Sequence, residues 1–138
     1  ESSEVWIYYN ATRFRGPEYL YEGKVDPHYF SDAAALNLAK LRLDGFVSLD
    51  AEEGEIITAP FEWSGGRLHV NAQIKGELRA ELLDAETTEP LAGTIDAVPL
   101  TGDHLDGKLS WTAQPAAGRA VRVRFKLRDA SLYAFWIR

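Results

Sequence analysis

Cysteine is absent from this sequence, and so is methionine. Without thiols the chain can form neither a disulfide framework nor a thiolate metal site, and cysteine usage gives no information about the redox compartment. The chain opens Glu1-Ser2-Ser3-Glu4, without the basic and then apolar pattern of a signal peptide. We therefore expect a processed product or a fragment of a larger protein. No apolar run approaches the roughly 20 residues of a membrane-spanning helix, which predicts a soluble chain with no membrane span.

Positive charge is also in deficit, with 15 Lys and Arg against 21 Asp and Glu and a formal net charge of -6. Binding to a phosphate backbone requires a clustered excess of Lys and Arg, so nucleic acid is excluded as the expected partner. The length of 138 residues and the 46% hydrophobic content suit one domain with one core.

Strict alternation of apolar and polar residues is the clearest local signal, since a half-buried strand places every second side chain on the core face. It runs through 119–129, 67–74 and 77–82. The side chains expected in the core are Leu68, Val70, Leu78, Leu82, Leu109, Trp111, Val121, Val123, Phe125 and Leu127. His69 and its polar neighbours along the strand are expected on the outer face. These patterns predict antiparallel strands with one face in the core and one face exposed to solvent.

Further strands are expected over 5–9, 35–41, 46–49, 55–59, 108–113 and 131–137. Turn residues separate the predicted strands, among them Asp44-Gly45, Glu53-Gly54, Lys75-Gly76 and Asp129-Ala130. Many short strands separated by such turn residues are typical of a sandwich. We therefore predict an all-β fold, an antiparallel two-layer β-sandwich of jelly-roll type that occupies residues 1–138 as a single domain. The one helical turn expected lies around Ser31 to Ala35.

Several segments together resemble the C-terminal part of bacterial propeller glycosidases and their uncharacterised relatives. In that family a five-bladed β-propeller related to levanases and arabinanases precedes a β-sandwich domain. The resemblance lies in Leu41-Arg42-Leu43-Asp44-Gly45-Phe46-Val47-Ser48-Leu49, in Gly66-Arg67-Leu68-His69-Val70-Asn71, in Leu100-Thr101-Gly102-Asp103 and in the segment from Val121 to Phe135. Upstream, Glu4-Val5-Trp6-Ile7-Tyr8-Tyr9 resembles the closing strand of such a propeller.

The resemblance implies a secreted or cell-surface bacterial protein in which a covalently linked propeller carries the catalytic carboxylates. Residues 1–41 would then be the closing blade edge of a truncated propeller. A glycosidase needs two carboxyl groups that flank the glycosidic bond, and the resemblance places neither of them in this chain. No catalytic residue is therefore assigned, and no cofactor is expected. The carboxylates of Asp103 and Asp106 offer a weak candidate for a structural Ca2+ site.

Aromatic residues are the candidate ligand contacts, because a sugar ring packs its C–H face against an aromatic plane. Trp63 precedes the turn Ser64-Gly65-Gly66 and is expected to be exposed, although a ring folded back over the sheet is the alternative. Tyr19, Tyr21 and Tyr29 lie in a long connection over 10–32, and long connections in compact domains are often functional. The sequence thus predicts a polysaccharide or oligosaccharide site formed by these four residues.

Other exposed groups have plainer interpretations. Trp6 and Tyr8 share one strand face, with Val5, Ile7 and Tyr9 on the other, so this segment is expected to be either a central strand or a strand that exposes an aromatic strip. Such a strip would be an interface with the absent propeller. The basic stripe of Arg122, Arg124, Lys126 and Arg128 is expected to pair with Glu77 and Glu81 on a neighbouring strand. One of Tyr133 and Trp136 is expected to point outward, and Trp136 is the better candidate of the two.

Three functions follow from these patterns. The first is a noncatalytic accessory domain of a glycoside hydrolase, which the resemblance favours. The second is an autonomous carbohydrate-binding module that stacks polysaccharide on exposed aromatic residues. The third is a jelly-roll glycosidase with a carboxylate pair drawn from Glu18, Glu22 and Asp26 in the long connection.

Overall fold

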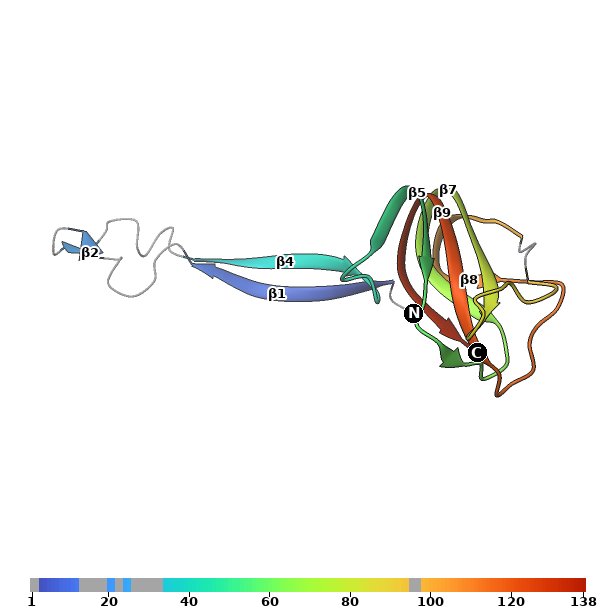
Figure 1. The fold of residues 1–138 in the computed structure, drawn as a ribbon. Helices are drawn as coiled ribbons and strands as arrows, with labels where there is room; N and C mark the ends of the chain where they lie inside the picture. Colours follow the sequence, from blue (N-terminus) through green and yellow to red (C-terminus); the bar gives the residue numbers. More distant parts are fainter. Residues whose placement is uncertain (1–2, 13–19, 22–23, 26–33, 95–97) are drawn as a thin grey trace. The chain divides into compact units, whose positions relative to one another are not determined.

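The structure is a computed structural model that describes residues 3–12, 20–21, 24–25, 34–94 and 98–138 (Figure 1). These residues form strands and turns and contain no helix. Accordingly, they include no helical segment of the length and hydropathy needed to cross a membrane. The chain divides into two compact units, Glu1–Leu43 and Asp44–Arg138. The boundary falls two residues beyond the segment 1–41 that the sequence set apart.

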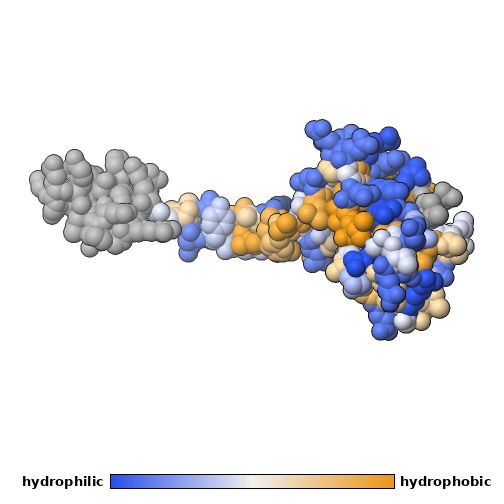
Figure 2. Space-filling view, in the orientation of Figure 1, coloured by the Kyte–Doolittle hydropathy of each residue, from blue (hydrophilic) through white to orange (hydrophobic). Residues whose placement is uncertain are grey.

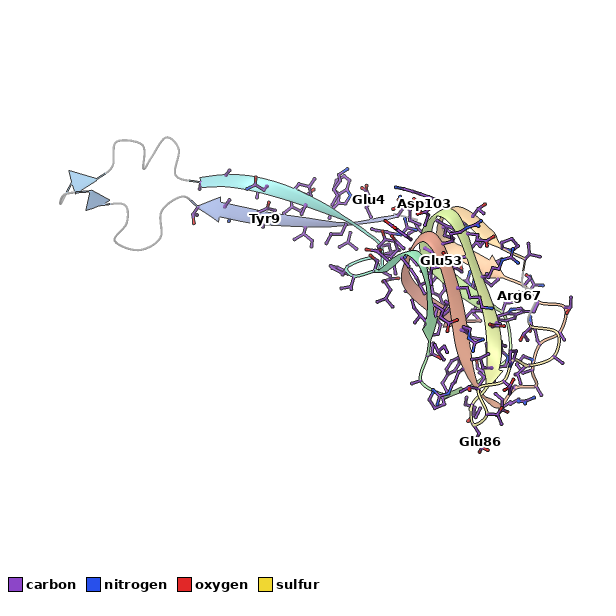
Figure 3. All side chains as sticks on the ribbon, turned by 45° about the horizontal axis from the view of Figure 1, so that its top comes forward. Glu4, Tyr9, Glu53, Arg67, Glu86 and Asp103 are labelled. Atoms are coloured by element: carbon purple, nitrogen blue, oxygen red, sulfur yellow. The ribbon has the colours of Figure 1, made fainter. Side chains whose placement is uncertain are left out.

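The first unit is built on a two-stranded antiparallel ribbon. Strand β1 (Glu4–Thr12) pairs with β4 (Ala34–Arg42) in continuous register from Glu4 opposite Arg42 to Thr12 opposite Ala34. Two short strands, β2 (Leu20–Tyr21) and β3 (Lys24–Val25), pair with each other. Apolar side chains lie along the ribbon, and side chains project from both of its faces (Figures 2 and 3). The helical turn expected at Ser31 to Ala35 falls mostly outside the described residues, and its last two positions belong to β4.

The second unit is an antiparallel sheet with the strand order β5-β9-β7-β8, in which β6 also pairs with β9. The strands are β5 (Leu49–Ile57), β6 (Phe61–Glu62), β7 (Leu68–Asp84), β8 (Leu100–Leu109) and β9 (Ala120–Ile137). Strands β7 and β9, of 17 and 18 residues, are so long that each of them runs through both layers of the sandwich. The sheet stays open, with β5 and β8 at its edges among the described residues.

The sheet bends where both long strands carry an irregularity. The β7–β9 register shifts between Ile74 and Glu77, and opposite this shift Asp129 has a left-handed φ of 44°. At Gly76 an added Cβ would lie 2.3 Å from the carbonyl oxygen of Arg128, so only glycine lets the two backbones come this close. The bend therefore depends on a pair of residues that the sequence marks as turn formers.

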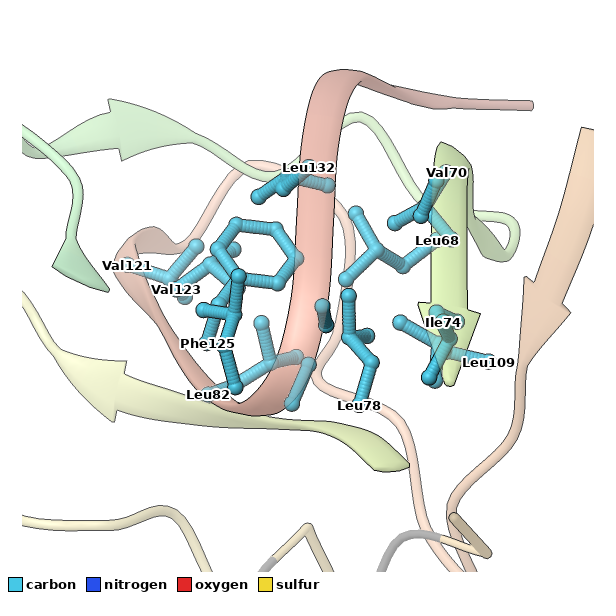
Figure 4. Packing of buried hydrophobic residues seen from close by; sticks show 14 of the residues in the cluster. Leu68, Val70, Ile74, Leu78, Leu82, Leu109, Val121, Val123, Phe125 and Leu132 are labelled. Carbon is cyan, nitrogen blue, oxygen red and sulfur yellow. The ribbon is translucent and has the colours of Figure 1, made fainter. Parts of the chain in front are cut away.

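The bend brings the apolar faces of the two sheet halves together into one core. Side chains buried in the core come from both halves of β7 and β9 and from β8 (Figure 4). All the core residues predicted from alternation are buried except Trp111, which is half-buried and packs against the core. Its indole Nε1–H donates to the carbonyl oxygen of Ala80 at 2.6 Å. The structure thus confirms the all-β antiparallel sandwich.

Several expected turns are instead positions within strands. Segments 67–74 and 77–82 form one strand, as do 119–129 and 131–137, because Lys75-Gly76 and Asp129-Ala130 form bulges. The expected strands 46–49 and 55–59 are replaced by the single strand β5, with Glu53-Gly54 inside it. The strand expected over 108–113 runs earlier, as β8, and ends before Trp111.

Candidate functional site

Trp63, the main candidate for a sugar platform, is completely buried. Its backbone N–H donates to the carbonyl of Arg119 at 2.8 Å, and its carbonyl accepts from the N–H of Gly118 at 2.8 Å. These bonds hold the residue beside β9 and direct the ring inward, where it packs edge-on against Trp111 with ring centroids 6.0 Å apart. The exposed position proposed for Trp63 was therefore wrong, since a buried ring presents no plane to a sugar, and the alternative of a ring folded back over the sheet is confirmed. The indole instead fills the end of the core.

The other three candidates belong to the first unit. Tyr21 ends strand β2 and pairs with Lys24 across the short hairpin. Tyr19 and Tyr29 lie outside the described residues, as do the carboxylates of Glu18, Glu22 and Asp26. The described residues therefore assemble neither the predicted aromatic site nor a glycosidase carboxylate pair from this connection.

The ribbon exposes aromatic and aliphatic side chains on both faces. Directly opposed residues of an antiparallel pair share a face, and successive residues alternate between faces. One face carries Trp6 and Tyr8, whose exposed fractions are 51% and 61%, and it also carries Leu38. The opposite face carries Ile7 and Tyr9, at 38% and 49%. Of the two alternatives expected at Trp6 and Tyr8, the described residues show the exposed aromatic strip, and a second apolar face lies behind it.

A small charged cluster lies at the end of this strip where β1 begins. The indole Nε1–H of Trp6 donates to Oε2 of Glu4 at 2.8 Å, and the Lys40 ammonium lies 4.4 Å from the Trp6 ring centroid. Lys40 also pairs with Glu4 at 3.4 Å. The hydrogen bond from Trp6, followed by the charge of Lys40, holds the pKa of Glu4 below its ordinary value. These contacts fix the orientation of the Trp6 ring.

The basic stripe of β9 is balanced by carboxylates, as predicted. The buried carboxylate of Glu81 accepts from Arg124 at 3.0 Å and pairs with Lys126 at 2.9 Å. Arg128 lies 3.7 Å from Glu77. Charge paired in this way across neighbouring strands stabilises the sheet. The guanidinium of Arg122 donates instead to the backbone carbonyls of Ala85 and Thr58.

A buried histidine lies on the outer face of the other layer of the sandwich, where the first half of β7 pairs with the second half of β9. His69, expected at the surface, is only 2% exposed because Trp136 stacks on it with ring centroids 5.8 Å apart. Its Nδ1 lies 2.5 Å from Oδ1 of Asp106, and Asp106 also pairs with Arg138. This hydrogen bond, with a further contribution from Arg138, keeps the pKa of Asp106 below its ordinary value. The expected surface position of His69 was wrong because an aromatic ring from the neighbouring strand covers the imidazole.

This cluster joins three strands but lacks the parts of a reaction centre. No serine or threonine is bonded to His69 in the described structure, so the His–Asp pair has no nucleophile to activate. Asp106 is committed to His69 and Arg138, and no three His, Cys, Asp or Glu side chains among the described residues are grouped to hold a metal ion. The chemistry that the cluster supports is hydrogen bonding between strands. Sequence reasoning missed it because its members lie on β7, β8 and β9.

Two of the surface depressions along strand β5 differ in character. A polar hollow of about 380 Å³ at the bend is lined by side chains that include Asp50, Gln73, Lys75 and Ser131. Hydrogen bonds from Ser131 and then Ser48 hold the pKa of Asp50 below its ordinary value. The second depression is an apolar groove of about 350 Å³, lined by Val47, Ser48, Leu49, Ile56, Thr58, Phe125, Leu132, Tyr133, Ala134 and Phe135. Of these two depressions, the apolar groove has the character of a contact surface, as do the two apolar faces of the ribbon.

Comparisons with protein-family profiles, with curated proteins and with solved structures found no match to this chain.

Proposed function

We propose that this chain is a noncatalytic β-sandwich accessory module of a carbohydrate-active enzyme, a glycoside hydrolase whose propeller domain is covalently linked to it. One observation supports the proposal above the others. In the described residues, β1 and β4 pair only with each other, and both faces of the ribbon expose large apolar side chains. A two-stranded ribbon of this kind is marginally stable alone and is completed by further strands and packing.

The ribbon suits the inside of a larger β domain. A surface hairpin needs one polar face, whereas this one carries Trp6 and Tyr8 on one side and Ile7 and Tyr9 on the other. Its free edges can accept further strands through backbone hydrogen bonds. The resemblance of the segment from Glu4 to Tyr9 to the closing strand of a propeller supports a propeller as the linked domain. In the proposal, the ribbon is the covalent and structural link to the catalytic domain.

The catalytic part of the proposal is tested by comparing two proteins. The full-length gene product and the 138-residue chain are assayed for release of reducing sugar from a panel of fructans and arabinans. We expect the full-length protein to hydrolyse at least one polysaccharide and the 138-residue chain to hydrolyse none. Turnover by the short chain, or an inactive full-length protein across the panel, contradicts the proposal.

The structural part is tested on the ribbon with a matched pair of variants in the full-length protein. Tyr8→Asp places a charge on an apolar face that the proposal buries, so we expect loss of soluble, active enzyme. Asn10→Asp adds a charge on the same strand face at a position that is already polar and exposed, and it serves as the control. If both variants retain parental activity and melting temperature, the ribbon is not buried in a larger domain.

An autonomous carbohydrate-binding module is the second candidate, because the exposed rings of Trp6, Tyr8 and Tyr9 provide apolar planes for sugars. Titration of the 138-residue chain with soluble polysaccharides, followed by tryptophan fluorescence, separates the two candidates. A saturable change that is abolished in Trp6→Ala, in a variant whose sandwich still folds, supports glycan binding by the ribbon. A flat titration leaves the accessory-module proposal.

A further inference from the structure

The sandwich unit contains a complete core and sheet of its own. All residues of the hydrophobic core cluster, with those packed against it, lie between Ala51 and Ile137. The strands of this unit pair among themselves, in the order β5-β9-β7-β8 with β6 beside β9. Residues 44–138 also exceed the roughly 70–80 residues below which a single core rarely suffices for a stable fold. We therefore expect this unit to fold without the rest of the chain.

The ribbon unit contributes nothing to that core. No described residue of the first unit belongs to the core cluster. Within the described chain, strands β1 and β4 pair only with each other, and a two-stranded ribbon is marginally stable alone in water. Removal of the ribbon takes no side chain from the sandwich core, so the sandwich should remain folded after its loss.

The segment that joins the two units is exposed and lies outside the strands. Strand β4 ends at Arg42 and β5 begins at Leu49, while residues 43–48 form turns, bends and irregular backbone. Phe46 and Val47 are 65% and 76% exposed, and in this part of the described chain they take part in no backbone–backbone hydrogen bond. Proteases cut most readily in exposed connections between compact units, because the backbone there is free to enter the active site of the protease.

Phe46 gives this segment a defined point of cleavage. Proteases with a hydrophobic S1 pocket take in a large apolar side chain and hydrolyse the peptide bond that follows it. Of the aromatic residues that the structure describes, only Phe46 is both exposed and outside a strand. Tyr8 is equally exposed at 61%, but its backbone belongs to β1 and pairs with β4.

We propose that residues 43–48 are a proteolytic processing site, at which an endopeptidase that accepts a large apolar side chain cuts after Phe46 and releases the sandwich as an independently folded unit. Water is the second reactant. It adds across the Phe46–Val47 peptide bond and leaves a carboxylate on Phe46 and a new amino group on Val47. The inference goes beyond the proposed function, because it separates the sandwich from the ribbon and does not depend on the activity of a linked domain.

Limited digestion of the 138-residue chain with chymotrypsin tests the cleavage site. We expect a lasting product that begins at Val47 and ends at Arg138, identified by intact mass and N-terminal sequencing. Phe46→Ala should slow the formation of this product at least about tenfold, because the S1 pocket loses the side chain that it binds. Tyr8→Ala is the matched control. It removes an aromatic side chain of similar exposure from a strand and should leave the rate unchanged.

The purified product tests whether the sandwich is independent. We expect it to separate from the fragments of the first unit in gel filtration and to melt cooperatively. It should also recover the same melt after it is unfolded in urea and diluted, because its core and sheet are complete. A product that unfolds irreversibly, or that elutes together with the first unit, overturns the release of a folded sandwich.

Three outcomes of the digestion overturn the processing site. Degradation of the whole chain without a lasting product shows that the sandwich does not resist cleavage on its own. A lasting product that retains β4 shows that the junction is protected. Formation of the product by Phe46→Ala at the parental rate shows that the cut lies elsewhere. Because Phe46 is 65% exposed, Phe46→Ala is expected to fold, and its thermal melt verifies this.

Discussion

Phe125 and Phe135 belong to the same strand, ten positions apart, yet their ring centroids lie 5.2 Å apart. A straight strand rises about 3.3 Å per residue, so ten residues would separate the two rings by about 33 Å. Contact between them requires β9 to fold back within its own length. Phe61 joins the same group, with its ring centroid 6.4 Å from that of Phe135. The two layers of this sandwich are thus halves of the same strands.

The ring of Phe125 lies at the centre of this arrangement, and its removal should be costly. We expect Phe125→Ala to lower the free energy of unfolding by about 3–5 kcal/mol, through lost burial and the cavity left behind. Phe46→Ala is the matched control, because Phe46 is 65% exposed and its loss should change stability by less than about 0.5 kcal/mol. Urea denaturation measures both. Equal midpoints for the two variants would show that the register of β9 is wrong.

The bend should be sensitive to a single methyl group at Gly76. An added Cβ meets the backbone oxygen of Arg128, which cannot rotate away, so Gly76→Ala should destabilise the sandwich by about 1–3 kcal/mol. Gly54→Ala, whose Cβ would lie 3.3 Å from the Cβ of Ala51, should change stability by less than about 1 kcal/mol. Thermal melts followed by circular dichroism compare them. A melting temperature for Gly76→Ala at or above that of Gly54→Ala would contradict the bend geometry.

The buried carboxylate of Glu81 should contribute more than its exposed neighbour. Glu81→Gln removes the charge that pairs with Arg124 and Lys126, and we expect a loss of about 1–3 kcal/mol. Glu55→Gln removes a contact of 3.8 Å whose carboxylate side chain is 57% exposed, so its effect should stay below about 0.5 kcal/mol. Chemical denaturation at low and high salt tests both. A larger loss in Glu55→Gln would mean that the ion pairs are ranked wrongly.

Asp84 should make stability depend on pH in acid. The backbone N–H of Thr87, followed by the guanidinium of Arg119, lowers the pKa of Asp84 from 3.8 to about 2. The folded state therefore favours the carboxylate, whose stabilising contribution is complete above pH 3.8 and is lost as the pH falls through about 2. We expect a shallower loss of melting temperature over this window in Asp84→Asn than in the parent. Arg119→Gln should lie between them, and identical profiles in all three would exclude this role.

Tryptophan accessibility separates the buried ring from the exposed one. Trp6 is 51% exposed and Trp63 is 0% exposed, so acrylamide should quench the first far more readily than the second. We expect Trp6→Phe to remove most of the readily quenched emission and Trp63→Phe to leave it. If Trp63→Phe removes this component instead, Trp63 is exposed and returns as a candidate sugar contact.

Bulge residues show where local patterns mislead. Lys75-Gly76 and Asp129-Ala130 have the composition of turns, and the chain does bend there. A hairpin turn would reverse the chain and pair the flanking segments with each other, whereas a bulge lets the strand continue into the second layer. Which of these occurs depends on the partner strand, because each bulge is matched by the other across the sheet. Composition at one position carries no information about that partner.

The burial of single side chains at the candidate sites also depends on distant parts of the chain, which a local pattern does not report. Alternation placed Val121, Val123 and Phe125 in the core correctly, because a strand with a period of two has one face in and one face out. The same rule put His69 outside, where a ring from another strand covers it. Trp63 follows no alternation, so its exposure was inferred from the turn beside it, and backbone hydrogen bonds to Gly118 and Arg119 directed it inward instead.

Residue types and their spacing were enough to predict the class of fold, the two-sided apolar character of the β1 segment and the charge pairing of the β9 stripe. Each of these follows from alternation along the strands. The folding-back of four predicted segments as two strands, the burial of Trp63 and the apolar groove beside β5 could be found only in the folded structure. These features depend on which side chains approach from distant parts of the chain, and the contacts that place them form only when the sheet bends.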